Sequence, residues 1–181
     1  MAAFYHAEPA MNQSDTSLWT FCLSFYSFPQ VESVCLELQD RGGVNINSLL
    51  WAMWLDRIGP SVSAEVWSQG HEKTAVWRQW VILPLRRLRR RLPKRSPWLA
   101  VRRAVQRWEL RAEKRELEQL QQIAMNTHEV RIGQAMDWEI DNPSDWYFLR
   151  QLLQAESDLC DQLIELFEHW RLETMESCSS S

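Results

Sequence analysis

The residues best suited to binding chemistry lie in a strongly basic central segment. Between positions 73 and 107 the chain has many arginines and lysines and neither Asp nor Glu. Arginine dominates, and its planar guanidinium pairs bidentately with phosphate or carboxylate groups. The candidate residues for binding an anionic partner are Arg86, Arg87, Arg89, Arg90, Arg91, Lys94, Arg95, Arg102, Arg103 and Arg107.

Tryptophans interleave with the arginines of this segment, at Trp77, Trp80, Trp98 and Trp108. Exposed indole rings beside arginines suit base stacking on RNA or single-stranded DNA. Filling a core is the more common use of a tryptophan. The segment therefore predicts an acidic protein or a nucleic acid as partner. Burial of all four rings, together with pairing of the arginines with the C-terminal acids, would remove the support for nucleic acid.

The acidic C-terminal region offers a competing explanation of the basic segment. If it packs beside the arginines, the charges neutralise one another within the chain and no external partner is required. The sequence leaves this intramolecular clasp open as an alternative. Its acids are Asp137, Glu139, Asp141, Asp145, Glu156, Asp158, Asp161, Glu165, Glu168, Glu173 and Glu176.

Convergent catalytic groups are scarce in the sequence. The four histidines do not form a helical zinc signature, and the chain has no phosphate-binding glycine loop and no nucleophile elbow. Asp137 and Asp141 have a D-x-x-x-D spacing that suits Mg²⁺, but a second copy of the motif is missing. We expect no cofactor, no metal and a non-enzymatic binding or adaptor protein. The alternative is an enzyme with a metal or small-molecule pocket between helices.

The elements that position these residues are expected to be helices. The chain has only 5 Gly and 7 Pro, which is too little turn punctuation for many short strands. Apolar residues recur at spacings of three and four, which predicts an all-α single-domain bundle of about six or seven helices with a Trp-rich core over residues 14–176. Residues 1–13 and 177–181 lack this periodicity and are expected to be disordered.

Three helices are predicted before residue 60. The first begins at Ser14 or Asp15 and ends near Phe28, and the second begins at Pro29 and ends at Gly42-Gly43. The third has Asn45 or Asn47 as its N-cap and is stopped by Gly59-Pro60. It is apolar over most of its circumference, so we expect it at the centre of the core.

The basic segment is divided among several helices. A short helix over 63–69 and a longer one over 71–83 precede Pro84, which is expected to interrupt the helix. An amphipathic basic helix follows. Attachment to a membrane surface through its apolar side is a third interpretation, which requires exposed leucines. These leucines are Leu85, Leu88 and Leu92.

A long helix is predicted from Pro97 to about Asn126, with Ser96 as its N-cap. Its apolar stripe drifts in the second half of the helix to Leu117, Leu120 and Ala124. In the first half the stripe contains Trp98, Val101, Val105, Trp108 and Ala112.

The last predicted helix spans 141–175 and has a heptad-like seam. Such a seam needs a partner helix, either within the same domain or in a homodimer. Both alternatives stay open. The seam consists of Leu149, Leu152, Glu156, Leu159, Leu163, Leu166 and Trp170.

The overall composition is that of a soluble protein of a reducing compartment. The formal net charge is −4, and no apolar run is long enough to cross a membrane. The four cysteines are widely spaced within apolar patterns, which predicts buried thiols. The N-terminus has no secretory signal pattern, so we expect a cytoplasmic protein.

Two stretches of the sequence resemble a bacterial family called domain of unknown function 2390. The first is CLELQDRGGVNINSLLWAMWLDRI over 35–58, and the second is VILPLRRLRRRL over 81–92. The resemblance implies a small cytoplasmic helical protein and no known activity. Its motif residues are Gln39, Asp40, Gly43, Asn47 and Trp54, of which Gln39, Asp40 and Asn47 bracket a tight corner between two helices. We expect a capping role for the polar ones, with a ligand site at this corner as the alternative.

Overall fold

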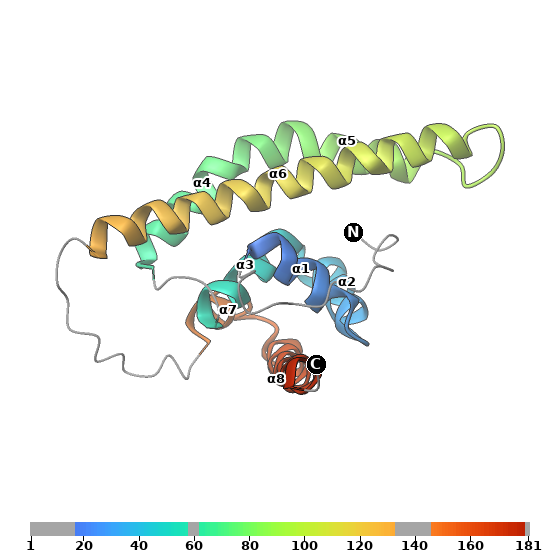
Figure 1. The fold of residues 1–181 in the computed structure, drawn as a ribbon. Helices are drawn as coiled ribbons and strands as arrows, with labels where there is room; N and C mark the ends of the chain where they lie inside the picture. Colours follow the sequence, from blue (N-terminus) through green and yellow to red (C-terminus); the bar gives the residue numbers. More distant parts are fainter. Residues whose placement is uncertain (1–16, 58–61, 133–145, 180–181) are drawn as a thin grey trace. The chain divides into compact units, whose positions relative to one another are not determined.

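The computed structural model of the protein describes residues 17–57, 62–132 and 146–179. All regular structure in these ranges is helical, which confirms the predicted fold class (Figure 1). The chain forms two compact units, Val62–Val130 and the remainder on either side of it. The single domain expected over 14–176 stays a prediction, and each unit is described by itself. The predicted disorder of 1–13, the Gly59-Pro60 stop and the aspartates at 137, 141 and 145 lie outside the described residues.

The first unit begins with two helices whose ends are set by specific residues. Helix α1 spans Leu18–Ser27, and the Ser17 side chain accepts a hydrogen bond of 3.1 Å from the Thr20 amide. Helix α2 spans Val31–Gly42 and ends at Gly43, whose φ of 63° is the left-handed conformation that glycine adopts without strain. The predicted glycine stop is confirmed. The predicted start at Pro29 is two residues early, because Gln30 is left-handed and cannot belong to the helix.

Helix α3 spans Ile46–Arg57 and occupies the core as predicted. Asn45 accepts a hydrogen bond of 2.8 Å from the Ser48 amide, so Asn45 and not Asn47 is its cap. The residues of its middle turns are fully buried, including Trp51 and Trp54. A helix that is apolar all round can only be stable when other helices surround it.

The C-terminal part of the first unit consists of two helices where the sequence predicted one. Helix α7 spans Tyr147–Leu152, and helix α8 spans Ser157–Ser179. The turn between them allows α7 to pack on α3 while α8 packs on α2. Helix α8 also continues to Ser179, beyond the predicted end near Met175.

The seam of the last helix packs inside the first unit. Leu159, Leu163 and Leu166 are buried, as is Trp170. Phe167 and Trp170 of α8 meet Phe21 and Phe25 of α1 with ring centroids 5.5 to 6.1 Å apart. Edge-to-face aromatic pairs of this kind stabilise a core beyond their buried area. This face is therefore covered within the unit, and homodimerisation stays a prediction.

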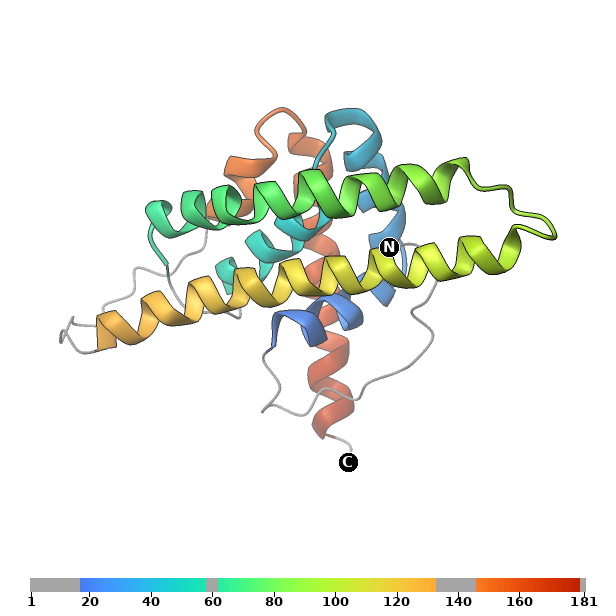
Figure 2. The ribbon, with the colours of Figure 1, turned by 90° about the horizontal axis from the view of Figure 1, so that it is seen from above.

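The second unit is a helical hairpin. Helix α4 spans Ala64–Trp77, a π-helical turn η1 spans Arg78–Ile82, and α5 spans Leu83–Arg91. The long helix α6 spans Leu99–Ile132 and runs antiparallel beside them (Figures 1 and 2). The separate helices predicted over 63–69 and 71–83 form one helix.

Pro84 does not interrupt this helix. It occupies the first turn of α5, directly after the π-helical turn. Proline has no amide hydrogen to donate to the preceding turn, and a wider turn accommodates both the missing hydrogen bond and the ring. The long helix α6 begins at Leu99, after the predicted start at Pro97, and ends at Ile132, beyond the predicted end near Asn126.

A buried carboxylate joins two helices of the first unit. Asp56 of α3 accepts hydrogen bonds of 3.1 and 3.0 Å from the amides of Phe148 and Leu149, in the first turn of α7. These amides have no partner within their own helix, so Asp56 satisfies them and complements the helix dipole.

We expect Asp56→Ala to lower the free energy of unfolding by about 1–2 kcal/mol, because two buried amides lose their acceptor. Urea unfolding followed by far-ultraviolet circular dichroism measures the change. Asp40→Ala is the control, since Asp40 is exposed at the end of α2 and its loss is expected to change stability by less than about 0.5 kcal/mol. Equal effects of the two substitutions would contradict this role of Asp56.

Candidate anion-binding surface

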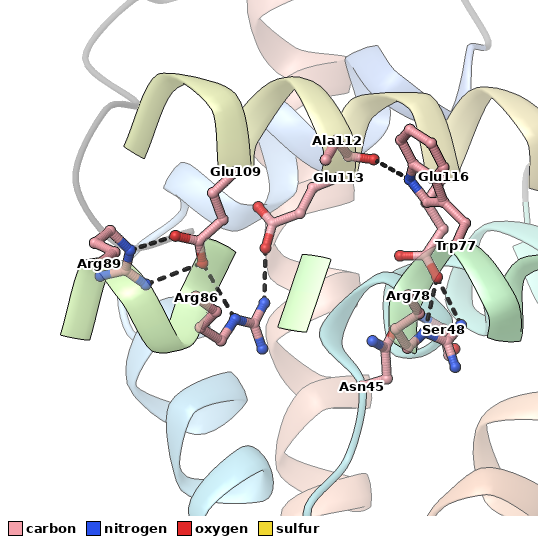
Figure 3. A network of polar contacts seen from close by, with 10 residues as sticks. All are labelled: Asn45, Ser48, Trp77, Arg78, Arg86, Arg89, Glu109, Ala112, Glu113 and Glu116. Carbon is pink, nitrogen blue, oxygen red and sulfur yellow. Dashed lines mark hydrogen bonds and ion pairs between the residues drawn. The ribbon is translucent and has the colours of Figure 1, made fainter. Parts of the chain in front are cut away.

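Three glutamates on one side of α6 bind arginines of the facing helices. Glu109, Glu113 and Glu116 are all buried, although they are carboxylates. Their spacings of four and three place them on one face of the helix. A buried carboxylate is stable only when cations and hydrogen bonds compensate it, so their partners determine how the hairpin is built (Figure 3).

The partners of these glutamates come from η1 and α5. Arg78 Nε donates to Glu116 Oε1 over 2.8 Å. Arg86 reaches two carboxylates, with 2.7 Å from Nη2 to Glu113 Oε1 and 3.2 Å from Nε to Glu109 Oε1. Arg89 donates through Nε and Nη2 to the two oxygens of Glu109, which makes a bidentate pair. We call these contacts the Arg–Glu ladder.

The ladder shifts the pKa of Glu109. Burial by itself raises the pKa of this carboxyl group, but the hydrogen bonds from Arg89 and Arg86 and the positive charge of Arg89 outweigh burial and lower it. The same hydrogen bond raises the pKa of Arg89. Both groups are therefore held in their charged forms.

Two further contacts join the helices of the hairpin. The Trp77 indole donates a hydrogen bond of 3.0 Å to the Ala112 carbonyl. The Arg102 guanidinium donates to the backbone carbonyls of Arg89 and Leu92, with 3.0 Å to the latter. Carbonyls at the end of a helix lack partners within it, and a cation satisfies them well. Arg102 thus closes the end of α5.

These contacts divide the ten predicted anion-binding residues into two groups. Arg86, Arg89 and Arg102 bind groups within the hairpin. The other seven are exposed and form no ion pair with another described residue. We call these seven the exposed cations, and they are Arg87, Arg90, Arg91, Lys94, Arg95, Arg103 and Arg107.

The tryptophans of the basic segment are not all buried. Trp77 is half-buried, whereas Trp80 is 75 % exposed, Trp98 is 48 % exposed and Trp108 is 60 % exposed. The predicted apolar stripe at the start of α6 is therefore split, because Val105 and Ala112 are buried and its other three members are exposed. The burial that would have removed the support for nucleic acid is not observed.

Four of the C-terminal acids that lie in the described residues approach arginines within their own unit, namely Glu156, Asp158, Asp161 and Glu168. Asp161 pairs with Arg150 over 3.1 Å, and Arg41 approaches Glu156 and Asp158 at 3.9 and 3.8 Å. All of these are exposed or partly exposed pairs, which contribute little to stability. The clasp between these acids and the basic segment stays a prediction.

The described cysteines are buried thiols, and the motif residues lie in α2 and α3 or at the end of α2. Burial raises the pKa of Cys35 to about 12 and that of Cys22 well above its usual value, so both thiols stay protonated. Among the motif residues, Asn47 and Trp54 are buried in α3, Gly43 ends α2, Gln39 is half-buried and Asp40 is exposed.

In the described part of the chain, no three His, Cys, Asp or Glu side chains are placed to hold a metal ion. None of its helices is long and apolar enough to cross a membrane.

The family model described as protein of unknown function (DUF2390) matches residues 17–120, which is more than half of the chain. The chain belongs to the DUF2390 family. No curated protein and no solved structure matches it. In this DUF2390 protein the matched region contains α1 to α5, the exposed cations and the ladder residues.

The three ladder glutamates were not predicted from the sequence. Acidic partners were expected only in the C-terminal region, and 98–112 was interpreted as an apolar stripe. The available signal was the spacing of the glutamates. Glu109 lies four residues after Val105, and Glu116 lies four residues after Ala112, so the acids continue the core-facing spacing. Acids at such positions indicate buried partners when a basic helix precedes them.

We expect Glu109→Gln to destabilise the protein by about 3 kcal/mol at neutral pH, because it leaves Arg89 without its carboxylate. The folded-state pKa of Glu109 is lowered, so its contribution is complete above the unfolded value of roughly 4.3 and is lost as pH falls through the lower folded value. The difference between wild type and variant should therefore shrink in acid. Urea unfolding over a series of pH values measures it.

Glu118→Gln is the matched control for this prediction. Glu118 lies nine residues after Glu109 and so on the opposite side of α6. Its substitution is expected to have little effect at any pH. A Glu109→Gln penalty that does not change with pH would show that the carboxylate charge is not what stabilises the hairpin.

Proposed function

We propose that the protein is a non-enzymatic binding or adaptor protein that contacts an anionic partner through the end of its helical hairpin. The observation that carries the proposal is the division of the arginines. The exposed cations lie on α5, on the first turns of α6 and on the connection between these helices. Three further arginines are held inside the hairpin and fix the helices that present them.

The local charge supports this proposal. The whole chain has a formal net charge of −4, so attraction to an anion has to come from a local surface. No Asp or Glu occurs between Lys73 and Arg107, and the next acid, Glu109, is already compensated by two arginines. A surface with one sign of charge raises the rate of association with an oppositely charged partner.

Arginine also determines which anions fit. Its fork of donors recognises phosphate and carboxylate groups, which occur in nucleic acids and acidic proteins respectively. The exposed Trp98 and Trp108 rings add a stacking surface that a nucleic acid would use. Both partner classes expected from the sequence are therefore compatible with this surface.

We expect the double substitution Arg87→Glu with Arg91→Glu to weaken retention on immobilised heparin, a linear polyanion. Both side chains are exposed, and neither belongs to the Arg–Glu ladder. Elution should occur at about half the salt concentration that elutes the wild type, since binding through released counterions depends steeply on salt. Helicity measured by circular dichroism should be unchanged.

The matched control is Lys73→Glu with Arg115→Glu, which changes the net charge equally at exposed positions outside the hairpin end. If both double variants elute together, retention reflects total charge and the proposed surface has no special role. For capture experiments from cell extract, nuclease treatment distinguishes nucleic acid from an acidic protein.

A further inference from the structure

Three exposed apolar side chains of the hairpin end follow a simple rule of position, whereas Trp98 and Leu99 do not. Leu88 precedes Arg89, Val101 precedes Arg102, and Trp108 precedes Glu109. Each second member of these pairs bridges the two helices. The first members are 47 %, 47 % and 60 % exposed respectively. These three apolar residues thus lie one position before a residue that faces the other helix.

This rule places the three side chains on one side of the hairpin. One residue back along an α-helix is a rotation of about 100°. In two antiparallel helices, a residue one position before a facing residue lies on the same side of the pair in both helices. Leu85, which precedes Arg86, belongs to this side and is half-buried, as is Leu92, so of the three leucines that membrane attachment required to be exposed only Leu88 is exposed. We call Leu85, Leu88, Val101 and Trp108 the apolar side.

Cations border the apolar side. Arg91 lies three residues after Leu88, and Arg111 lies three residues after Trp108, so each is a surface neighbour on its helix. The Arg111 guanidinium lies 5.5 Å from the centre of the Trp108 ring. Lys94 and Arg95 lie on the connection at the hairpin end and are exposed.

An apolar strip with Trp and Leu, bordered by Arg and Lys, matches the chemistry of an anionic lipid surface. Aliphatic and indole groups enter the boundary between head groups and acyl chains, while arginines reach the anionic head groups. Clusters of four to eight basic residues provide the electrostatic attraction. Stacking on bases would use Trp108 but gives no role to the exposed aliphatic groups of Leu88 and Val101.

We propose that the hairpin end docks on an anionic lipid bilayer, with its apolar side in the interfacial layer and the bordering cations Arg91, Lys94, Arg95 and Arg111 on the head groups. This inference rests on the proposed function, because it names the anionic partner as a lipid surface. No crossing of the bilayer is involved, since the hairpin lies at the interface.

The test is flotation of the full-length protein with lipid vesicles. One set contains phosphatidylcholine only, and the other contains an added third of phosphatidylglycerol. We expect binding to the anionic vesicles alone. Val101→Ser with Trp108→Ser should weaken this binding at least about tenfold, since the apolar groups supply part of the affinity.

The matched control is Val76→Ser with Trp80→Ser, which removes the same two side-chain types from the same hairpin. Val76 lies in α4 and is 67 % exposed, and Trp80 lies in η1 and is 75 % exposed. Both lie before α5 in the sequence. This variant should bind vesicles as the wild type does. Circular dichroism confirms that both variants keep their helicity.

The other outcomes separate this inference from the proposed function. If the two Val/Trp variants bind vesicles equally, or if the wild type binds polyuridylate RNA and no vesicle, the lipid inference is overturned and the anionic-partner proposal stands. If the wild type binds neither vesicles, RNA nor heparin, both fail. Loss of vesicle binding in Arg91→Glu with Lys94→Glu, which removes two cations that border the apolar side, supports both.

Discussion

The buried carboxylates of Glu109, Glu113 and Glu116 determine how the second unit is built. A carboxylate in a protein interior has to be compensated by a cation with good hydrogen-bond geometry. The chain meets this requirement with Arg78, Arg86 and Arg89 from the facing helix. Because each arginine has to reach its glutamate, the ladder fixes the register and rotation of α5 against α6.

The rotation fixed by the ladder separates the remaining side chains into surfaces. Residues that precede a bridging residue form the apolar side, as Leu88 and Trp108 do. Residues that follow one, such as Arg87, Arg90 and Arg103, point to the other side by the same reasoning. A composition that looks uniformly basic along the chain thus becomes an ordered surface with an apolar and a cationic part.

Local signals in the sequence were sufficient for the corner between α2 and α3. The left-handed Gly43, an asparagine cap at position 45 or 47 and the burial of Trp51 and Trp54 each depend on a few neighbouring residues, and all could be predicted. The break between α7 and α8 could not, because it depends on where α3 and α2 lie in space. The π-helical turn before Pro84 escaped prediction for a similar reason, since a proline in a helical pattern usually ends the helix.

The candidate surface was predicted only in part. The sequence identifies the arginines, but it does not show which of them face acids some twenty to forty residues further along the chain, as Arg86 faces Glu109 and Glu113. The exposure of Trp80 and Trp108 also depends on this pairing, because the ladder occupies the face that a purely apolar stripe would otherwise use. Charge pairing between helices was therefore the missing information.

The most direct test of this account is the hydrogen exchange of the arginine side chains, measured by nuclear magnetic resonance. The Nε–H groups of Arg78, Arg86 and Arg89 donate to buried carboxylates, so their signals should persist at neutral pH and exchange slowly. Those of Arg87, Arg90 and Arg91 should exchange with water at the rate of free arginine. Equal rates for the two groups would contradict the division of the basic segment on which the account rests.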